Sequence, residues 1–211
     1  MFKGLFRPDS NLMIVMNQVT DCIFLSLFFL IGCVPVLTVG ASIAALYDAS
    51  YRGYRRAEKH TWQRFAQVFR DNWKPGIVPT LVFFAAVWGI GKVMILIWNA
   101  TVAGTLSWMV FAGAALVAVL LVGVISVLFP MLSRFDNPVG TLLKNTAVLA
   151  LANVPRTLAL GILNAFTFFL CIRYVLPAFV LPALAALIGS LLIEPMFKPY
   201  MPEEPAEEAA E

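Results

Sequence analysis

The stretch PVLTVGASIAALYDASYRGYRR, from Pro35 to Arg56, begins with apolar residues and ends with three arginines in five positions. Its alanines and serines favour close packing between helices, and the pattern predicts a helix over residues 38–54. Such a helix rises about 21 Å between Thr38 and Arg52, which is short of a membrane core about 30 Å thick. The topology of the chain therefore depends on whether this helix crosses the membrane.

Composition indicates a membrane protein. Hydrophobic residues make up 61% of the 211-residue chain and charged residues only 13%, about half the charged fraction of a soluble domain. Three long blocks contain a single charged residue each: 10–47 (Asp21), 75–133 (Lys92) and 157–193 (Arg173). A helix needs about 20 apolar residues to cross a bilayer, so each block can cross about twice. The sequence predicts an all-α, polytopic transmembrane helical bundle.

Positive charge orients the predicted helices. The segment Arg52–Lys74 carries seven bases against two acids, which indicates a cytoplasmic loop, and Lys3 and Arg7 place the N-terminus on the same side. Both ends of the intervening segment then lie inside, so it crosses twice and residues 38–54 form a return helix. A re-entrant half-helix for part of this segment stays open as an alternative.

Six membrane helices are expected, over approximately residues 12–34, 38–54, 76–98, 108–132, 157–174 and 176–193. We expect the last of them to be kinked at Pro177 and Pro182. Residues 1–195 would form one domain in the cell membrane with both termini cytoplasmic. Residues 196–211, which carry five glutamates, would form a disordered acidic tail.

Two amphipathic segments, residues 61–73 and 138–153, are expected to lie at the membrane interface. In the first, aromatic side chains share one helical face and polar side chains share the other. The candidates for contact with the membrane surface or with a partner are Trp62, Phe65, Phe69, Trp73, Arg64 and Arg70. A lipid surface and a protein surface require the same pattern, so both remain open. In the second segment Asn137 is the candidate N-cap, with Pro138 at the first helical position.

Polar side chains inside the apolar blocks are candidates for transport or for a structural polar site: Asp21, Asp48, Asn17, Gln18 and Lys92. A carboxylate inside a membrane is costly and is a functional candidate by default, and packing of the first two helices can bring Asp21 and Asp48 together. Alternatively, Asp48 forms a local ion pair with Arg52 near the headgroups, and Lys92 extends its ammonium group to water.

No pattern typical of an enzyme occurs in the sequence. The single histidine, His60, has no second histidine or clustered cysteines with which to form a metal site. Anionic lipid explains the basic and aromatic residues of Arg52–Lys74 more simply than nucleic acid does. We therefore expect no catalytic residue, no metal, no cofactor and no nucleic-acid partner.

The segments PVLTVGASIAALYDASYRGYRR, FAQVFRDNW and RFDNPVGTLLKNTAVLALANVPRTL together resemble the YesL family of bacterial membrane proteins. The resemblance rests on a Thr-Val-Gly corner, an Ala-Leu-Tyr helix, a basic loop, a Phe-rich elbow and a second elbow that ends in Pro-Arg-Thr-Leu. It covers roughly residues 5–195. It implies a bacterial cell-membrane protein whose relatives are often encoded beside carbohydrate import systems, with carbohydrate ABC transporter subunits as partners besides the lipid bilayer.

We expect a non-enzymatic accessory or interaction subunit associated with carbohydrate transport, since few polar side chains interrupt the predicted helices. The alternative is a stand-alone transporter of a small molecule or an ion that uses the intramembrane acids. A transporter would gather its polar residues around one cavity near the midplane, whereas an accessory subunit would present an uncovered apolar helix face.

Overall fold

The computed structural model describes residues 11–55, 61–135 and 137–200, and the side chains within these ranges apart from those of residues 11–19, 54 and 55. All regular structure in these ranges is helical, which confirms the predicted all-α class. The helices are α1 (Asn11–Gly32), α2 (Val39–Arg55), α3 (Thr61–Asn72), α4 (Ile77–Val102), α5 (Trp108–Arg134), α6 (Val139–Ala152), α7 (Val154–Arg173) and α8 (Leu181–Phe197). Three short 3₁₀ turns cover Val36–Thr38, Leu176–Phe179 and Lys198–Tyr200.

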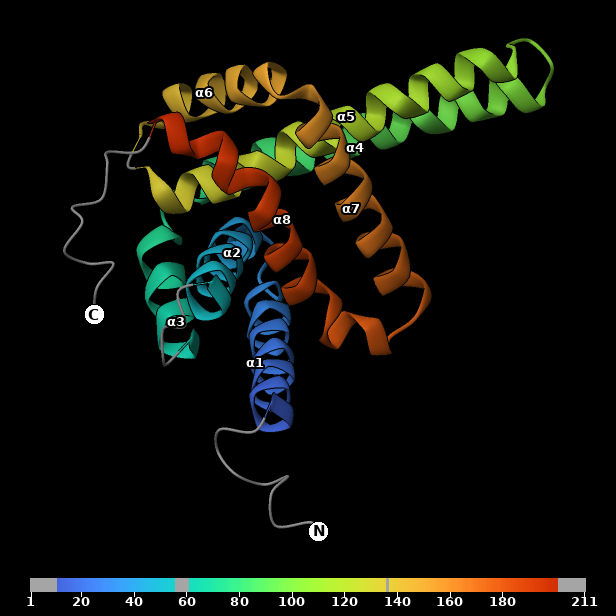
Figure 1. Ribbon diagram of the computed structural model, residues 1–211. Helices are drawn as coiled ribbons and strands as arrows, with labels where there is room; N and C mark the ends of the chain where they lie inside the picture. The colour runs from blue at the N-terminus through green and yellow to red at the C-terminus, as the bar shows by residue number, and fades with distance from the viewer. Residues whose placement is uncertain (1–10, 56–60, 136, 201–211) are drawn as a thin grey trace.

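Helix α2, which contains most of the stretch quoted at the outset, lies at the centre of the molecule (Figure 1). It packs against α1, α3, α4, α5 and α8. Its small side chains Ala41, Ala44, Ala45 and Ala49 are completely buried, which allows the neighbouring helices to approach closely. The helix is therefore enclosed by protein from Gly40 to Ser50.

Within the described part of the chain, four helical segments are long and apolar enough to cross a membrane: Ile77–Val102, Trp108–Arg134, Val154–Arg173 and Leu181–Tyr200. These segments make the chain a membrane protein by length and composition. The 17 residues of α2 are fewer than the roughly 20 that a crossing helix needs. In α1, the apolar part with described side chains, Thr20–Gly32, is also shorter than that.

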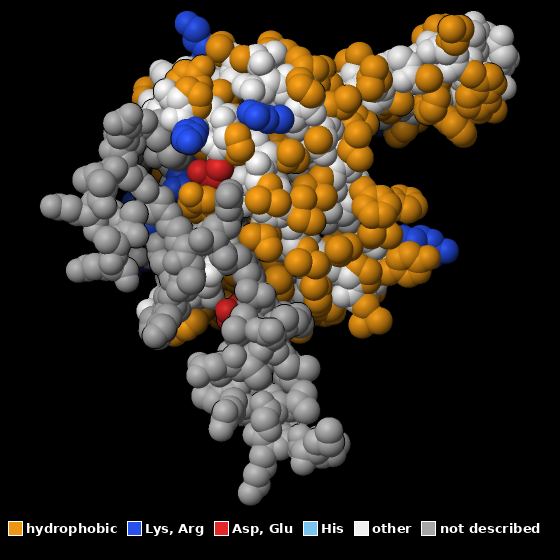
Figure 2. Space-filling view, in the orientation of Figure 1, with side chains coloured by type: hydrophobic (Ala, Val, Ile, Leu, Met, Phe, Trp, Pro, Cys, Tyr) orange, Lys and Arg blue, Asp and Glu red, His pale blue; other side chains and the backbone are white. Residues whose placement is uncertain are grey.

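Helices α4 and α5 form a hairpin whose outer half projects from the rest of the molecule (Figure 1). Only Pro79, Thr80 and Thr101 are buried along α4. Near the outer turn, the ring of Trp98 packs edge to face on those of Trp108 and Phe111, with ring centroids 5.9 and 5.4 Å away. Apolar side chains cover this hairpin and the adjoining face of the body (Figure 2). The hairpin therefore offers a long apolar surface.

The last membrane helix begins later than its sequence pattern predicts. The chain forms the 3₁₀ turn Leu176–Phe179 and starts α8 at Leu181, so the predicted helix start at residue 176 is wrong. Pro177 and Pro182 each lie in a first turn, where proline removes no helical hydrogen bond, and they turn the chain without kinking α8. Helical structure continues to Tyr200, and residues 201–211 of the expected acidic tail lie outside the described residues.

Helices α6 and α7 meet at a corner of one residue, Asn153. The hydroxyl of Thr157 donates a hydrogen bond back to the Ala150 carbonyl at 2.8 Å and holds this corner. Helix α6 begins at Val139 with Pro138 as its cap, so the prediction of Asn137 as the N-cap is wrong. The Asn137 side chain therefore does not cap α6.

Glycines bring α5 and α7 into close contact. A methyl group at Gly123 would overlap the Thr157 carbonyl oxygen, and one at Gly161 would overlap the Val119 carbonyl oxygen. The two backbones therefore cross at a distance that leaves no room for a side chain at either position. Both overlapping atoms belong to backbone, which cannot rotate away.

We expect Gly123→Ala to lower the free energy of unfolding by about 1–3 kcal/mol, because overpacking forces the two helices apart. The measurement is the thermal unfolding midpoint of the purified protein in detergent. Gly113→Ala on the same helix is the control, since no atom lies within 4 Å of its added methyl group. Equal midpoints for the two variants would contradict the close crossing.

Candidate functional site

The carboxylate of Asp48 on α2 is completely buried and is surrounded by arginines from three helices. Arg64 of α3 donates from its Nε to the Asp48 Oδ2 at 2.6 Å. Arg52, one turn further along α2, donates from its Nε to Oδ1 at 3.3 Å. The Nε of Arg134, at the end of α5, lies 4.0 Å from Oδ1. A buried carboxylate requires such partners, because leaving it unpaired costs several kcal/mol.

A second acid, Glu194 of α8, extends the network. Arg134 donates from a terminal nitrogen to the Glu194 Oε1 at 2.7 Å, and the Tyr47 hydroxyl donates to the same oxygen at 2.8 Å. The Arg134 guanidinium also lies over the ring of Tyr51, 4.3 Å from its centroid. Arg134 thus contacts groups from α2 and α8 at once, and we call these five charged side chains (Asp48, Glu194, Arg52, Arg64 and Arg134) the Asp48 network.

The charges and exposure of the Asp48 network define its chemistry. Three arginines and two acids give it a net charge of +1. The Arg134 side chain is 9% exposed, whereas those of Arg52 and Arg64 are 27% and 29% exposed and lead from Asp48 toward the surface. Both Asp48 oxygens accept hydrogen bonds from guanidinium groups. The arrangement therefore suits the clamping of α2, α3, α5 and α8 to one another.

The structure pairs Asp48 with Arg52, as the local ion-pair interpretation expected, but it buries the acid completely. Asp21 is exposed on α1 and lies outside the Asp48 network. The Lys92 ammonium lies over the exposed Trp88 ring, 5.4 Å from its centroid, on the projecting hairpin. The side chains of Asn17 and Gln18 lie outside the described part of the chain, as does His60.

Helix α3 docks on the protein by one face and exposes another. Phe65 and Val68 are buried, and the Phe65 ring stacks between those of Phe28 and Phe69 at 6.1 and 6.2 Å. Trp62 and Trp73, expected in the same stripe, are exposed beside this face.

The basic side chains of α3 point to different surroundings. Arg64, a candidate for surface contact, turns inward to Asp48, whereas Arg70 is exposed. Protein docking therefore explains the buried face of α3. Lipid contact remains a prediction for its exposed Trp62–Trp73 edge.

Sequence reasoning missed Arg134 and Glu194 as members of a site. Glu194 follows directly on the predicted end of the last membrane helix, and it is the only acid between residues 137 and 202. An isolated acid inside the apolar run LLIEPMF is a signal that could have indicated a buried ion pair. The partner of that acid could not be read from spacing, because Arg134 is far away in the sequence.

Residues 22–99 match the family model described as "Protein of unknown function, DUF624". The matched segment contains Asp48, Arg52 and Arg64 but not Arg134 or Glu194. No curated protein and no solved structure matches the chain.

We expect Asp48→Asn to destabilise the protein by about 1–3 kcal/mol, because a neutral amide replaces the buried carboxylate that accepts charged hydrogen bonds from Arg52 and Arg64. The measurement is the denaturation midpoint of the purified protein, with co-translational insertion checked by membrane fractionation. Arg52→Gln should cost less, because the partly exposed Arg52 leaves behind an acid that Arg64 still pairs. The control is Asp21→Asn, an exposed change expected to alter stability by no more than about 0.5 kcal/mol. If Asp48→Asn proved as stable as this control, the clamping role would be wrong.

Proposed function

We propose that the chain is a YesL-type integral membrane protein that acts as a non-enzymatic accessory or interaction subunit associated with carbohydrate transport. The match of residues 22–99 to a family of unknown function and the four candidate spans support the coarse part of this proposal. The link to carbohydrate transport rests on the resemblance alone.

The proposed topology has six crossings, with both termini and the segment Arg52–Lys74 in the cytoplasm. Helices α1 and α2 supply the two crossings beyond the four candidate spans. Seven bases against two acids in Arg52–Lys74 support this orientation, and the outer α4–α5 turn carries no charge. A short α2 suits a crossing that protein encloses, because its ends need not reach lipid headgroups directly.

Two observations support the functional proposal: the Asp48 carboxylate is fully paired, and the α4–α5 hairpin leaves its apolar surface uncovered. Asp48 has its hydrogen bonds satisfied by arginines and is packed among helices, which suits a structural clamp better than a transport site. Helix α4 packs against the body near its first turns, where Pro79 and Thr80 are buried. Its far half projects from the body (Figure 1) and leaves side chains such as Leu96 exposed. An apolar surface of this length fits a helix of another membrane subunit.

The orientation predicts the labelling of single cysteines placed in a chain that lacks Cys22, Cys33 and Cys171. Ser107→Cys, in the α4–α5 turn, should react with a membrane-impermeant maleimide in intact cells. Gln67→Cys, on the exposed polar face of α3, should react only after permeabilisation. Labelling of Gln67→Cys in intact cells would contradict the return crossing of α2.

The interaction role predicts that membrane subunits of a carbohydrate importer co-purify with the tagged chain from its native membranes. Leu96→Trp on α4 should lower their recovery severalfold, because it alters the uncovered face. Ile172→Trp on α7, where the side chain is equally exposed, should leave recovery unchanged. Recovery of the chain without such subunits would contradict this role.

Solute uptake by the purified chain alone in proteoliposomes, lost in the Asp21→Asn variant, would establish the transporter alternative instead.

A further inference from the structure

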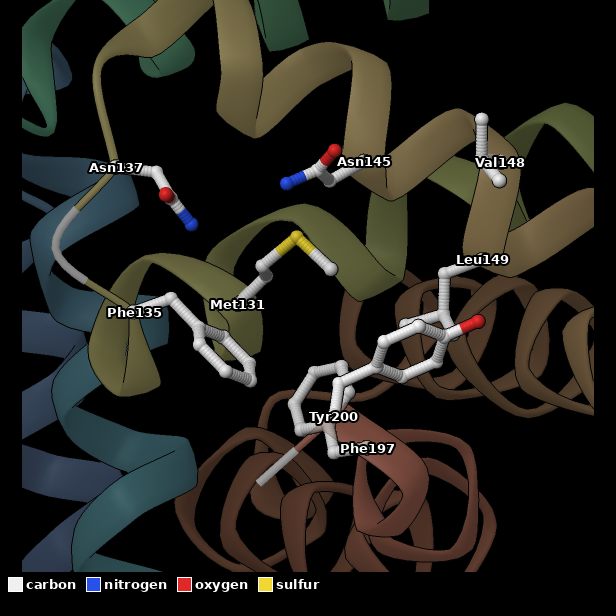
Figure 3. A pocket seen from close by; sticks show the side chains of 8 residues that line it. All are labelled: Met131, Phe135, Asn137, Asn145, Val148, Leu149, Phe197 and Tyr200. Atoms are coloured by element: carbon white, nitrogen blue, oxygen red, sulfur yellow. The ribbon is translucent and has the colours of Figure 1, made fainter. Parts of the chain in front are cut away.

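A pocket lies where the end of α5, the outer face of α6 and the end of α8 meet (Figure 3). Its volume is about 160 Å³. The floor is apolar and buried, and it consists of Met131, Leu149 and Phe197. The Thr146 hydroxyl, which donates to the Leu142 carbonyl, lies 3.4 Å from the Met131 sulfur, and the Phe135 ring packs edge to face on that of Phe197 at 5.6 Å. These contacts hold the floor in shape.

The rim of this pocket carries two carboxamides. Asn137 and Asn145 extend toward one another from the chain before α6 and from α6 itself, above the Met131 side chain (Figure 3). Among the described residues, neither carboxamide makes a side-chain hydrogen bond. Each can donate two hydrogen bonds and accept two. The rim can therefore bind a polar group of a molecule whose body rests on the apolar floor.

The pocket has room for about one ring on its floor. A cavity of roughly 150 Å³ lined by Leu, Ile and Phe accepts one benzene molecule. Among the residues that the structure describes, no charged side chain lines this pocket, so an ionic ligand would lose hydration there without gaining a counter-ion from them. A monosaccharide would press several hydroxyls against Met131, Leu149 and Phe197, which cannot pair them.

We propose that this pocket is a binding site for an uncharged, single-ring molecule that carries one hydroxyl or carboxamide group. The ring rests on Met131, Leu149 and Phe197, and the polar group hydrogen-bonds to Asn137 and Asn145. The site is separate from the Asp48 network and does not depend on the proposed transport role. Three of its lining residues, Phe135, Asn137 and Asn145, lie in the segment RFDNPVGTLLKN, part of one stretch that carries the YesL resemblance.

The test uses 4-fluorophenol as the probe and the full chain in lipid nanodiscs, observed by ¹⁹F NMR. We expect saturable binding above the partitioning measured in empty nanodiscs. Val148→Trp, at the exposed side of the pocket, should abolish the saturable part by filling the mouth. Leu151→Trp, at an equally exposed position of α6 that does not line the pocket, should leave binding unchanged.

The carboxamide is tested separately. Asn145→Leu keeps the side-chain size but removes the hydrogen-bonding groups, and it should weaken 4-fluorophenol binding roughly three- to tenfold while leaving fluorobenzene binding unchanged. Three results would overturn the proposal: no saturable binding to the wild-type chain, equal binding to the Val148→Trp and Leu151→Trp variants, or displacement of the probe by D-glucose.

Discussion

The pairing of the buried Asp48 carboxylate with arginines is the interaction on which the arrangement of the helices depends. A carboxylate with no exposed surface must be paired where it lies, and its partners come from α2, α3 and α5. Arg134 also forms an ion pair with Glu194, which ties α8 to the same group of charges. The alanines of α2 make this possible, because only small side chains let so many helices reach one position. Charge and close packing thus act together at the centre of the molecule.

The features that could be predicted from the sequence depend on residues close together in the chain, and those that could not depend on contacts between distant residues. Apolar blocks and helical periodicity are local features of the sequence, so the helices and the Asp48–Arg52 spacing of one turn could be predicted. The contact of Arg134 with Glu194 joins two distant helices and has no signal in spacing. Proline patterns were ambiguous for another reason: Pro177 and Pro182 fit either a kink or a first turn, and only packing selects the turn.

Polar side chains in this molecule fall into two groups with different consequences. Those of the Asp48 network are held by one another and by Tyr47, and they fix helices in place. The carboxamides of Asn137 and Asn145 face a pocket and have hydrogen-bonding capacity to spare. The sequence presents Asp48 and Glu194 much as it presents these two asparagines, as polar residues beside apolar runs. Their roles differ because the Asp48 network lies among packed helices and the carboxamides lie at an open rim.

The position of Asp48 also bears on the order in which the chain is synthesised. Arg52 leaves the ribosome directly after Asp48, and Arg64 follows with the next helix, so the acid has partners before α5 exists. Arg134 and Glu194 arrive only with α5 and α8. An early hairpin of α1 and α2 can therefore form with its carboxylate already paired to a neighbour in the same helix. Helix α8 then completes a clamp whose first half was assembled earlier in translation.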